Sequence, residues 1–329
     1  MRALVIGGTR FVGPRLVHSL LERGHEVTTF NRGHTPDELP EEVERLHGDR
    51  SDPSSLARAF ADRTFDGCVD TIAMRGSDTL AAIDALYDRV GHYVHFSTGQ
   101  VYLVREGCPS PAREEDYDGP LAAPPPGDAW DAGEWSYGIE KRECEDALEE
   151  AWAGRGFPAT RLRLTMIHGE DDPRGRLRAY VLRLTAGGPL LVPLEPSSRI
   201  RPIHAASVVD VVVDLLESGA GKGAAFNLAQ GEESTHEALI ERIAGLLGLE
   251  AELAPVRRAE LVEAGLFPGC APLAHTWMSL LDAGRAERGL GFEPGGFDDW
   301  LPDVVAQLRE LPPPIGFDVV RAREIALAG

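Results

Sequence analysis

The chain has 329 residues, 43% of them hydrophobic, and a formal net charge of −20. This length and apolar content suffice for one large domain or for two coupled domains with a substantial core. The acidic balance argues against nucleic acid and anionic membrane surfaces as general partners, because like charges repel. An anionic substrate would therefore need a local basic pocket.

The cysteine and histidine patterns argue against a metal site. The four cysteines are widely separated and form no CxxC or CxxH pattern, and the ten histidines show no HxxxH spacing. Unpaired thiols in a reducing cytoplasm are therefore favoured over disulfides. The N-terminal apolar run is too short for a signal peptide, and no apolar run reaches membrane-spanning length. We expect a cytoplasmic protein without a membrane partner or a bound metal.

The first part of the chain alternates between strand and helix patterns. Strands are predicted at 2–6, 26–30, within 41–49, 66–73 and 92–98, and helices at 14–24, 53–61 and 79–90. Pro14 in the first turn and Gly24 just past the end support the first of these helices. Strands separated by helices indicate a parallel sheet that is covered on both faces.

Residues 103–135 break this alternation, because they are rich in proline, glycine and acidic side chains. A connection of this length without regular patterns is either a lid over a site or an insertion without a role. Both interpretations remain open from the sequence.

Regular patterns return after this segment. Helices are predicted at 136–152, 175–186, 205–218, 234–248 and 298–309, and strands at 159–169, 190–193, 199–203 and 224–228. The three prolines at 312–314 end the last core helix, and the tail beyond them is expected to be helical or frayed. We predict an α/β fold with a doubly wound parallel sheet at 1–168, to which 204–230 returns. A smaller mixed substrate lobe is expected at 169–203 and 231–329.

The segment VIGGTRFVG at 5–13 lies between the first predicted strand and the first helix. Gly7 and Gly8 permit a tight turn, and Gly13 permits close packing of the helix on the sheet. Backbone N–H groups and a helix N-terminus at such a turn bind phosphate. In this setting the pattern favours the dinucleotide site of a Rossmann sheet, with a phosphate-binding turn formed by Gly7, Gly8, Thr9, Arg10, Phe11, Val12 and Gly13.

The second predicted strand suggests which dinucleotide is bound. An NAD site commonly has an acidic residue at this strand end, where it binds the ribose 2′-hydroxyl. Here Asn31 and Arg32 occupy that place, and Arg10 provides a second guanidinium. Guanidinium groups bind phosphate in a two-pronged way, so we expect selection of NADP over NAD by Arg10 and Arg32. The alternative is that both are solvated surface groups. Asp49 is expected near the adenine.

Tyr137 and Lys141 are four residues apart in a predicted helix and therefore lie on one helix face. A nearby ammonium favours the phenolate and lowers the pKa of a tyrosine from about 10, which suits proton exchange near neutral pH. Ser97 or Thr98, at the end of the fifth predicted strand, is placed to hydrogen-bond a substrate oxygen.

Taken in order, these segments resemble the extended short-chain dehydrogenases/reductases, the superfamily of NAD(P)-dependent epimerases, dehydratases and reductases. GGTRFVG resembles its TGxxGxxG, DGCVDTIA its DxVIHLAA, and HFSTGQVY its SSxxVYG. SYGIEK supplies the YxxxK, LRLTMIHGE resembles LRxxNVYGP, and RPIHAASVVDVV resembles xFIHVDDVA. The resemblance covers roughly residues 1–230.

The resemblance implies roles for individual residues. Tyr137 would exchange the proton, Lys141 would hold the nicotinamide ribose, and Thr98 would align the substrate oxygen. Ile72, Ala73 and Ser97 would join the cofactor site. The substrate-contacting positions of the family correspond to Gln100, Met166 and His168, and Arg174 and Arg201 are candidates for an anionic group. A buried structural role for His168 and solvated arginines are the alternatives.

Departures from the family pattern narrow the range of reactions that we expect. Arg10 replaces the middle glycine, as in atypical members such as the chloroplast stem-loop-binding relatives. Gly99 and Gln100 replace the Asp-Glu pair of the 4,6-dehydratases, which argues against dehydration. We expect an NADP(H)-dependent reductase or dehydrogenase acting on a hydroxyl or keto group of a sugar-like or natural-product substrate, with NAD as the alternative cofactor. A nucleotide-sugar epimerase and a non-catalytic RNA-binding relative are the alternatives, and a homodimer is one assembly that the resemblance implies.

Overall fold

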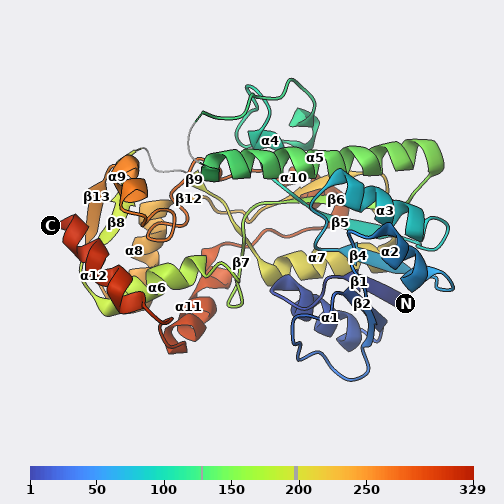
Figure 1. The fold of residues 1–329 in the computed structure, drawn as a ribbon, viewed down its shortest axis with the longest axis horizontal. Coiled ribbons are helices and arrows are strands. Elements are labelled where there is room, and N and C mark those ends of the chain that lie inside the picture. The colour runs from blue at the N-terminus through green and yellow to red at the C-terminus, as the bar shows by residue number, and fades with distance from the viewer. Residues whose placement is uncertain (127–128, 196–198) are drawn as a thin grey trace. The chain divides into compact units, whose positions relative to one another are not determined.

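The computed structural model describes residues 1–126, 129–195 and 199–329 of the chain. The chain divides into two compact units (Figure 1). Unit 1 contains Met1–Met166, Ile203–Ala229 and Ser279–Pro294, and unit 2 contains Ile167–Pro202, Gln230–Met278 and Gly295–Gly329. The expected boundaries at 168, 204 and 230 are close to these. Residues 279–294, expected in the smaller lobe, instead belong to unit 1.

Unit 1 is built on a seven-stranded parallel sheet with the order β11-β6-β5-β4-β1-β2-β3. Its strands are β1 (Arg2–Ile6), β2 (Glu26–Asn31), β3 (Glu44–His47), β4 (Gly67–Asp70), β5 (Tyr93–Thr98), β6 (Ala159–Leu164) and β11 (Ala225–Leu228). The central strands are buried almost throughout, which explains their near-continuous apolar sequences. The predicted α/β class with a parallel Rossmann-like sheet is thereby confirmed.

Helices cover both faces of this sheet (Figure 1). On one face, α1 (Val12–Glu22) packs against α7 (Ala205–Ser218). The other face carries α2 (Pro53–Phe60), α3 (Gly76–Leu86) and the long α5 (Ala129–Arg155). Shorter elements complete the unit: α4 (Gln100–Leu103), a 3-10 turn (Glu114–Tyr117), β10 (Ile203–His204) and α10 (Gly284–Leu290).

Unit 2 is smaller and less regular. Its helices are α6 (Arg176–Ala186), α8 (His236–Leu246), α9 (Arg258–Glu263), α11 (Leu301–Glu310) and α12 (Phe317–Ala328), and a 3-10 turn spans Phe297–Asp299. Its strands are β7 (Ile167–His168), β8 (Leu190–Pro193), β9 (Arg199–Ile200), β12 (Ser234–Thr235) and β13 (Leu253–Val256). The tail after the three prolines is therefore helical.

The segment 103–135 is more ordered than its composition suggested. Tyr117 and Ala112 are buried in a cluster with Val101 and Tyr102, so the middle of the segment is anchored in unit 1. Helix α5 already begins at Ala129, which shortens the expected loop. Residues 127 and 128 of this segment, and 196–198 of the expected smaller lobe, lie outside the described residues.

A buried ion pair joins helix α5 to the sheet. Arg163 of β6 donates from Nε and Nη2 to the Glu145 carboxylate of α5 at 2.7–3.0 Å, and both side chains are almost fully buried. Ser97 of β5 donates a further hydrogen bond to Glu145 at 2.5 Å. Burial alone would raise the pKa of Glu145, but the Arg163 charge and these hydrogen bonds hold the pKa below its ordinary value of 4.5.

We predict that Glu145→Gln lowers the free energy of unfolding by about 3–5 kcal/mol, because the buried Arg163 charge loses its counter-charge. Urea denaturation at pH 7 measures this difference. The wild-type pair should contribute its full stability above pH 4.5, the ordinary pKa of the carboxyl, and lose it as the pH falls through the lower folded-state pKa.

Glu149→Gln is a matched control on the same helix. Glu149 also pairs with an arginine of β6, Arg161, at 2.6 Å, but its side chain is 61% exposed. We expect its loss to cost less than about 1 kcal/mol. Equal destabilisation by the two substitutions would contradict the role assigned to the buried pair.

Candidate functional site

The glycine turn between β1 and α1 has the close approaches that its sequence predicts. Gly7 and Gly8 have φ values of +108° and +86°, which favour glycine. A Cβ on Gly13 would lie 2.6 Å from the carbonyl carbon of Gly8, so the first turn of α1 rests directly on the loop backbone. Phe11, with φ +53°, holds an uncommon conformation for a bulky residue. The turn therefore brings its backbone close to whatever binds there.

A cavity of about 410 Å³ opens beside this turn. It lies at the carboxyl ends of β1, β2, β3 and β4, the edge at which parallel sheets bind ligands. Its wall combines the glycine turn with the segments that follow the next three strands: Gly7, Gly8, Thr9, Arg10, Phe30, Asn31, Arg32, Gly33, His34, Thr35, Gly48, Asp49, Arg50, Ser51, Thr71 and Ile72. Eight of the residues predicted for the cofactor site are among them.

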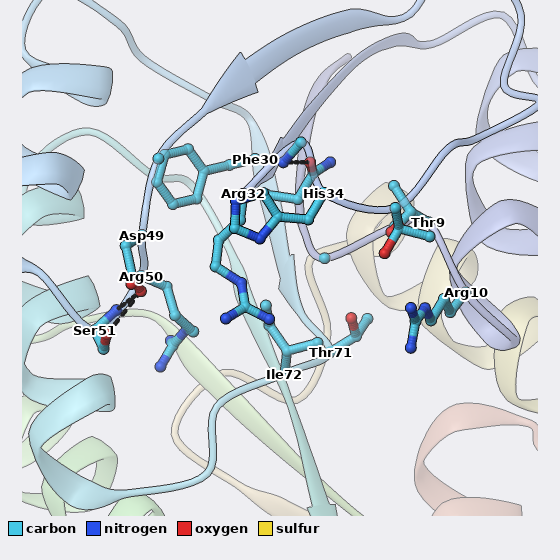
Figure 2. A pocket seen from close by; sticks show the side chains of 16 residues that line it. Thr9, Arg10, Phe30, Arg32, His34, Asp49, Arg50, Ser51, Thr71 and Ile72 are labelled. Carbon is cyan, nitrogen blue, oxygen red and sulfur yellow. Dashed lines mark hydrogen bonds between the residues drawn. The ribbon is translucent and has the colours of Figure 1, made fainter. Parts of the chain in front are cut away.

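The charged side chains are distributed around this cavity (Figure 2). Arg32 extends across it toward Ile72, whereas Arg10 lies on the other side of Thr71. The two guanidinium groups therefore face the cavity from different sides. The sequence had suggested that they lie together. His34 adds a titratable group near Arg32 that sequence reasoning missed.

Asp49 is the exposed acidic group of the cavity. Its carboxylate accepts hydrogen bonds from the backbone N–H and the hydroxyl of Ser51, at 2.9 and 2.6 Å. These hydrogen bonds, with a smaller contribution from the Arg32 charge, lower the pKa of Asp49. The carboxylate is therefore ionised at neutral pH and faces a wall that otherwise carries positive charge.

Asp70, at the end of β4, organises one wall of the cavity and was missed by the sequence reasoning. Its fully buried carboxylate accepts hydrogen bonds from Arg50, from the hydroxyl of Tyr93, and from the backbone N–H groups of Ile72 and Ala73. An acidic residue that ends an otherwise apolar strand was the available signal. Because Asp70 neutralises Arg50, the exposed positive charge in the cavity comes mainly from Arg10 and Arg32.

Lys141 is buried where α5 crosses the ends of two strands. Its Nζ donates to the carbonyl oxygens of Ala73 and Phe96 at 2.8 and 2.5 Å, and lies 3.2 Å from Nε2 of His95. Burial lowers the pKa of Lys141 and, together with the Lys141 charge, lowers the pKa of His95 well below 6.5. His95 is therefore neutral at pH 7 and can accept a hydrogen bond from the ammonium group.

Gln100 links the other two predicted catalytic positions. The Thr98 hydroxyl accepts a hydrogen bond from the backbone N–H of Gln100 at 3.3 Å. A Cβ on Gly138 would lie 2.9 Å from the Gln100 carbonyl oxygen, so α5 touches this backbone one residue after Tyr137. The structure thus brings the helix segment of Tyr137 against the segment that follows Thr98.

The other residues predicted for the cofactor site differ in their surroundings. Ile72 is exposed in the cavity wall, and Ala73 supplies a carbonyl to Lys141. Ser97 is buried and bound to Glu145, so it faces α5 and the core and not the cavity. The two-residue period of β5 explains this: Ser97 and His95 share one face of the strand, and both contact α5.

The predicted substrate residues outside this region are placed within their own units. Met166 ends the main part of unit 1. In unit 2, His168 is buried and stacks on Trp300 with a 6.1 Å separation of ring centroids, which fits a structural histidine. Arg174 is exposed, and Nε of Arg201 donates to the Gln230 carbonyl at 2.7 Å.

Two kinds of feature are absent from the described part of the chain. It contains no cluster of three His, Cys, Asp or Glu side chains that could hold a metal ion. None of its helices combines the length and the apolar composition that crossing a membrane requires.

Comparison with known sequences identifies relatives of this chain. Residues 3–88 match the NAD dependent epimerase/dehydratase family. The 2′-dehydrokanamycin reductase of Streptomyces kanamyceticus is 26% identical over 254 residues, which cover 75% of this chain and 67% of that protein. The chloroplast stem-loop binding protein of 41 kDa b of Arabidopsis thaliana is 25% identical over 74% of this chain and 62% of its own length.

Solved structures share the fold of nearly the whole chain. UDP-glucose 4-epimerase of Thermotoga maritima superimposes with a TM-score of 0.74 at 20% identity, covering 94% of this chain and 99% of that one. dTDP-glucose 4,6-dehydratase of Bacillus anthracis, solved in complex with NAD, also gives a TM-score of 0.74, at 18% identity over 93% of this chain and 96% of that one. Residues 3–88 therefore match the NAD dependent epimerase/dehydratase family, and nearly the whole chain has the fold of these two solved enzymes.

Proposed function

We propose that this chain is an NADP(H)-dependent oxidoreductase that acts on a hydroxyl or keto group of a sugar-like or natural-product substrate. The observation that carries the proposal is the cavity beside the glycine turn, whose exposed wall carries Arg10 and Arg32 and has no carboxylate at the end of β2. The relative named 2′-dehydrokanamycin reductase supports a reduction and a sugar-like substrate.

The glycine turn fits a dinucleotide. Gly13 packs against the backbone of Gly8, so the N-terminus of α1 lies beside the loop, where helix N–H groups bind phosphate oxygens. Arg32, beside the end of β2, is the main candidate for binding a ribose 2′-phosphate, and Arg10 adds positive charge from the other side of the cavity. When bound, the cofactor supplies or accepts a hydride.

The remaining steps belong to side chains of unit 1. The Tyr137 hydroxyl exchanges the proton with the substrate oxygen, and the Thr98 hydroxyl orients that oxygen by a hydrogen bond. Lys141 lies one helical turn from Tyr137 and supplies a buried ammonium group. The charge of this group favours the phenolate form of Tyr137. The carbonyl groups of Ala73 and Phe96 fix the position of this ammonium.

Two alternatives are distinguishable by experiment. A nucleotide-sugar epimerase would use the same tyrosine and lysine but would cause no net change in the absorbance of external cofactor. An RNA-binding role, suggested by the chloroplast relative, is disfavoured by the net charge of −20.

The four unpaired cysteines fit action in the reducing cytoplasm.

We predict that Gly13→Ala weakens NADPH binding by about tenfold or more, because the new methyl group would displace the loop backbone at Gly8. Fluorescence titration measures the affinity. Gly154→Ala, on α5, is the control, since a Cβ there meets no atom within 4 Å. Unchanged NADPH affinity in a folded Gly13→Ala protein would remove the glycine turn from the binding site.

We predict that replacing Arg10 and Arg32 together with alanine weakens NADP binding roughly 10- to 100-fold and NAD binding far less, because only NADP carries the 2′-phosphate. Arg32→Ala alone should account for most of the effect. Arg58→Ala, an exposed arginine of α2 outside the cavity, is the control. An equal loss for both cofactors would refute the selector role.

We predict that Tyr137→Phe retains NADPH affinity and the wild-type melting temperature but lowers turnover by about 10²- to 10⁴-fold, because the proton exchanger is lost. NADPH oxidation with a panel of keto sugars, including 2′-dehydrokanamycin, measures the turnover. Undiminished activity would remove Tyr137 from the mechanism.

A further inference from the structure

One polar cluster of unit 1 lies beside the proposed catalytic residues and is not used by them. Gln100 is 8% exposed, and its Nε2 donates a hydrogen bond to the carboxylate of Glu134 on α5. The other end of the same amide, Oε1, is buried without a hydrogen-bond partner among the described residues. A buried acceptor that lacks a donor costs free energy, so a ligand that donates to it is favoured.

The cluster is placed by the same contacts that place the catalytic groups. The backbone N–H of Gln100 is bonded to Thr98, and its carbonyl rests against Gly138. Glu134 precedes Tyr137 by three residues on α5, so both side chains lie on one face of the helix. A substrate whose oxygen lies between Thr98 and Tyr137 would therefore have a neighbouring group within reach of Gln100 and Glu134.

This cluster offers hydrogen-bond acceptors to a ligand. The amide orientation is fixed, because only Nε2 can donate to a carboxylate, and this leaves Oε1 as an acceptor. Glu134 is partly exposed and, within the described part of the chain, forms no ion pair. An ammonium group carries three donors and no acceptor and so complements both residues.

The surrounding charge favours a cation over the diphosphate of a nucleotide sugar. Arg142, further along α5, already donates to the carbonyl oxygens of Val101 and Tyr117. A diphosphate beside Glu134 would face an uncompensated carboxylate, and the net charge of −20 would add to the repulsion. The same field attracts cationic ligands.

We propose that Gln100 and Glu134 form a subsite that binds a protonated amino group of the substrate, which makes an amino sugar or aminocyclitol the substrate class. This inference rests on the proposed function, because it uses the positions of Thr98 and Tyr137 as the reacting centre. Glu134 acts through its charge and Gln100 through its free acceptor.

The test compares ligand binding by calorimetry at pH 7 in low salt, using the full chain saturated with NADPH. Kanamycin and glucosamine are the cationic probes, and raffinose and glucose are the neutral probes. We expect the wild type to bind at least one cationic probe at least tenfold more tightly than its neutral counterpart. Glu134→Gln should weaken that binding by about tenfold or more and leave neutral-probe binding and NADPH affinity unchanged.

Two further variants keep the test specific. Glu150→Gln removes one exposed negative charge from the same helix without touching the cluster, and should leave cationic binding within about twofold of the wild type. Gln100→Met removes the amide acceptor at similar size and should weaken cationic binding even if Glu134→Gln proves unstable.

The outcomes separate the two proposals. Equal loss in Glu134→Gln and Glu150→Gln would show a general charge effect and overturn the subsite, as would no preference for either amine over its neutral counterpart while NADPH still binds. Failure of the wild type to bind NADPH at all would overturn the proposed function instead.

Discussion

The contact between helix α5 and the end of strand β5 supports both the fold and the chemistry proposed for unit 1. Along one side of the helix, Glu134 and Gly138 contact Gln100, Lys141 contacts His95 and Phe96, and Glu145 contacts Ser97. These positions recur every three or four residues, as one face of a helix requires. Glycine at 138 is what permits the close approach, since a Cβ there would meet the Gln100 carbonyl oxygen.

The same contact explains how charged groups are retained in an apolar interior. Burying an ion is costly unless a partner and hydrogen bonds compensate it. Glu145 is compensated by Arg163 and Ser97, and Lys141 by two backbone carbonyls and a neutral imidazole. The lysine ammonium is thus held at a fixed place without a carboxylate beside it. An ammonium without a bound anion keeps its electrostatic effect for the role proposed for it beside Tyr137.

The cavity beside the glycine turn follows a different electrostatic principle. Its positive charge comes from exposed side chains on separate loops, whereas its one buried arginine, Arg50, is neutralised by Asp70. Asp70 also fixes the two backbone N–H groups that follow β4, so this carboxylate shapes the wall and does not contribute free charge.

Much of this protein follows from its sequence, because the determinants are local. The alternation of strands and helices predicted the parallel sheet, the glycine spacing predicted the turn before α1, and the four-residue spacing placed Tyr137 and Lys141 on one helix face. The boundaries of α7 were also predicted, since its apolar periodicity is strong. Tertiary structure decided what depends on distant segments: that Ser97 binds Glu145, that 279–294 belongs to unit 1, and that Arg10 and Arg32 lie on different sides of the cavity. The pairing of Glu134 with Gln100 belongs to this second group. These outcomes depend on how elements far apart in the chain pack together, and no local pattern of residues encodes that packing.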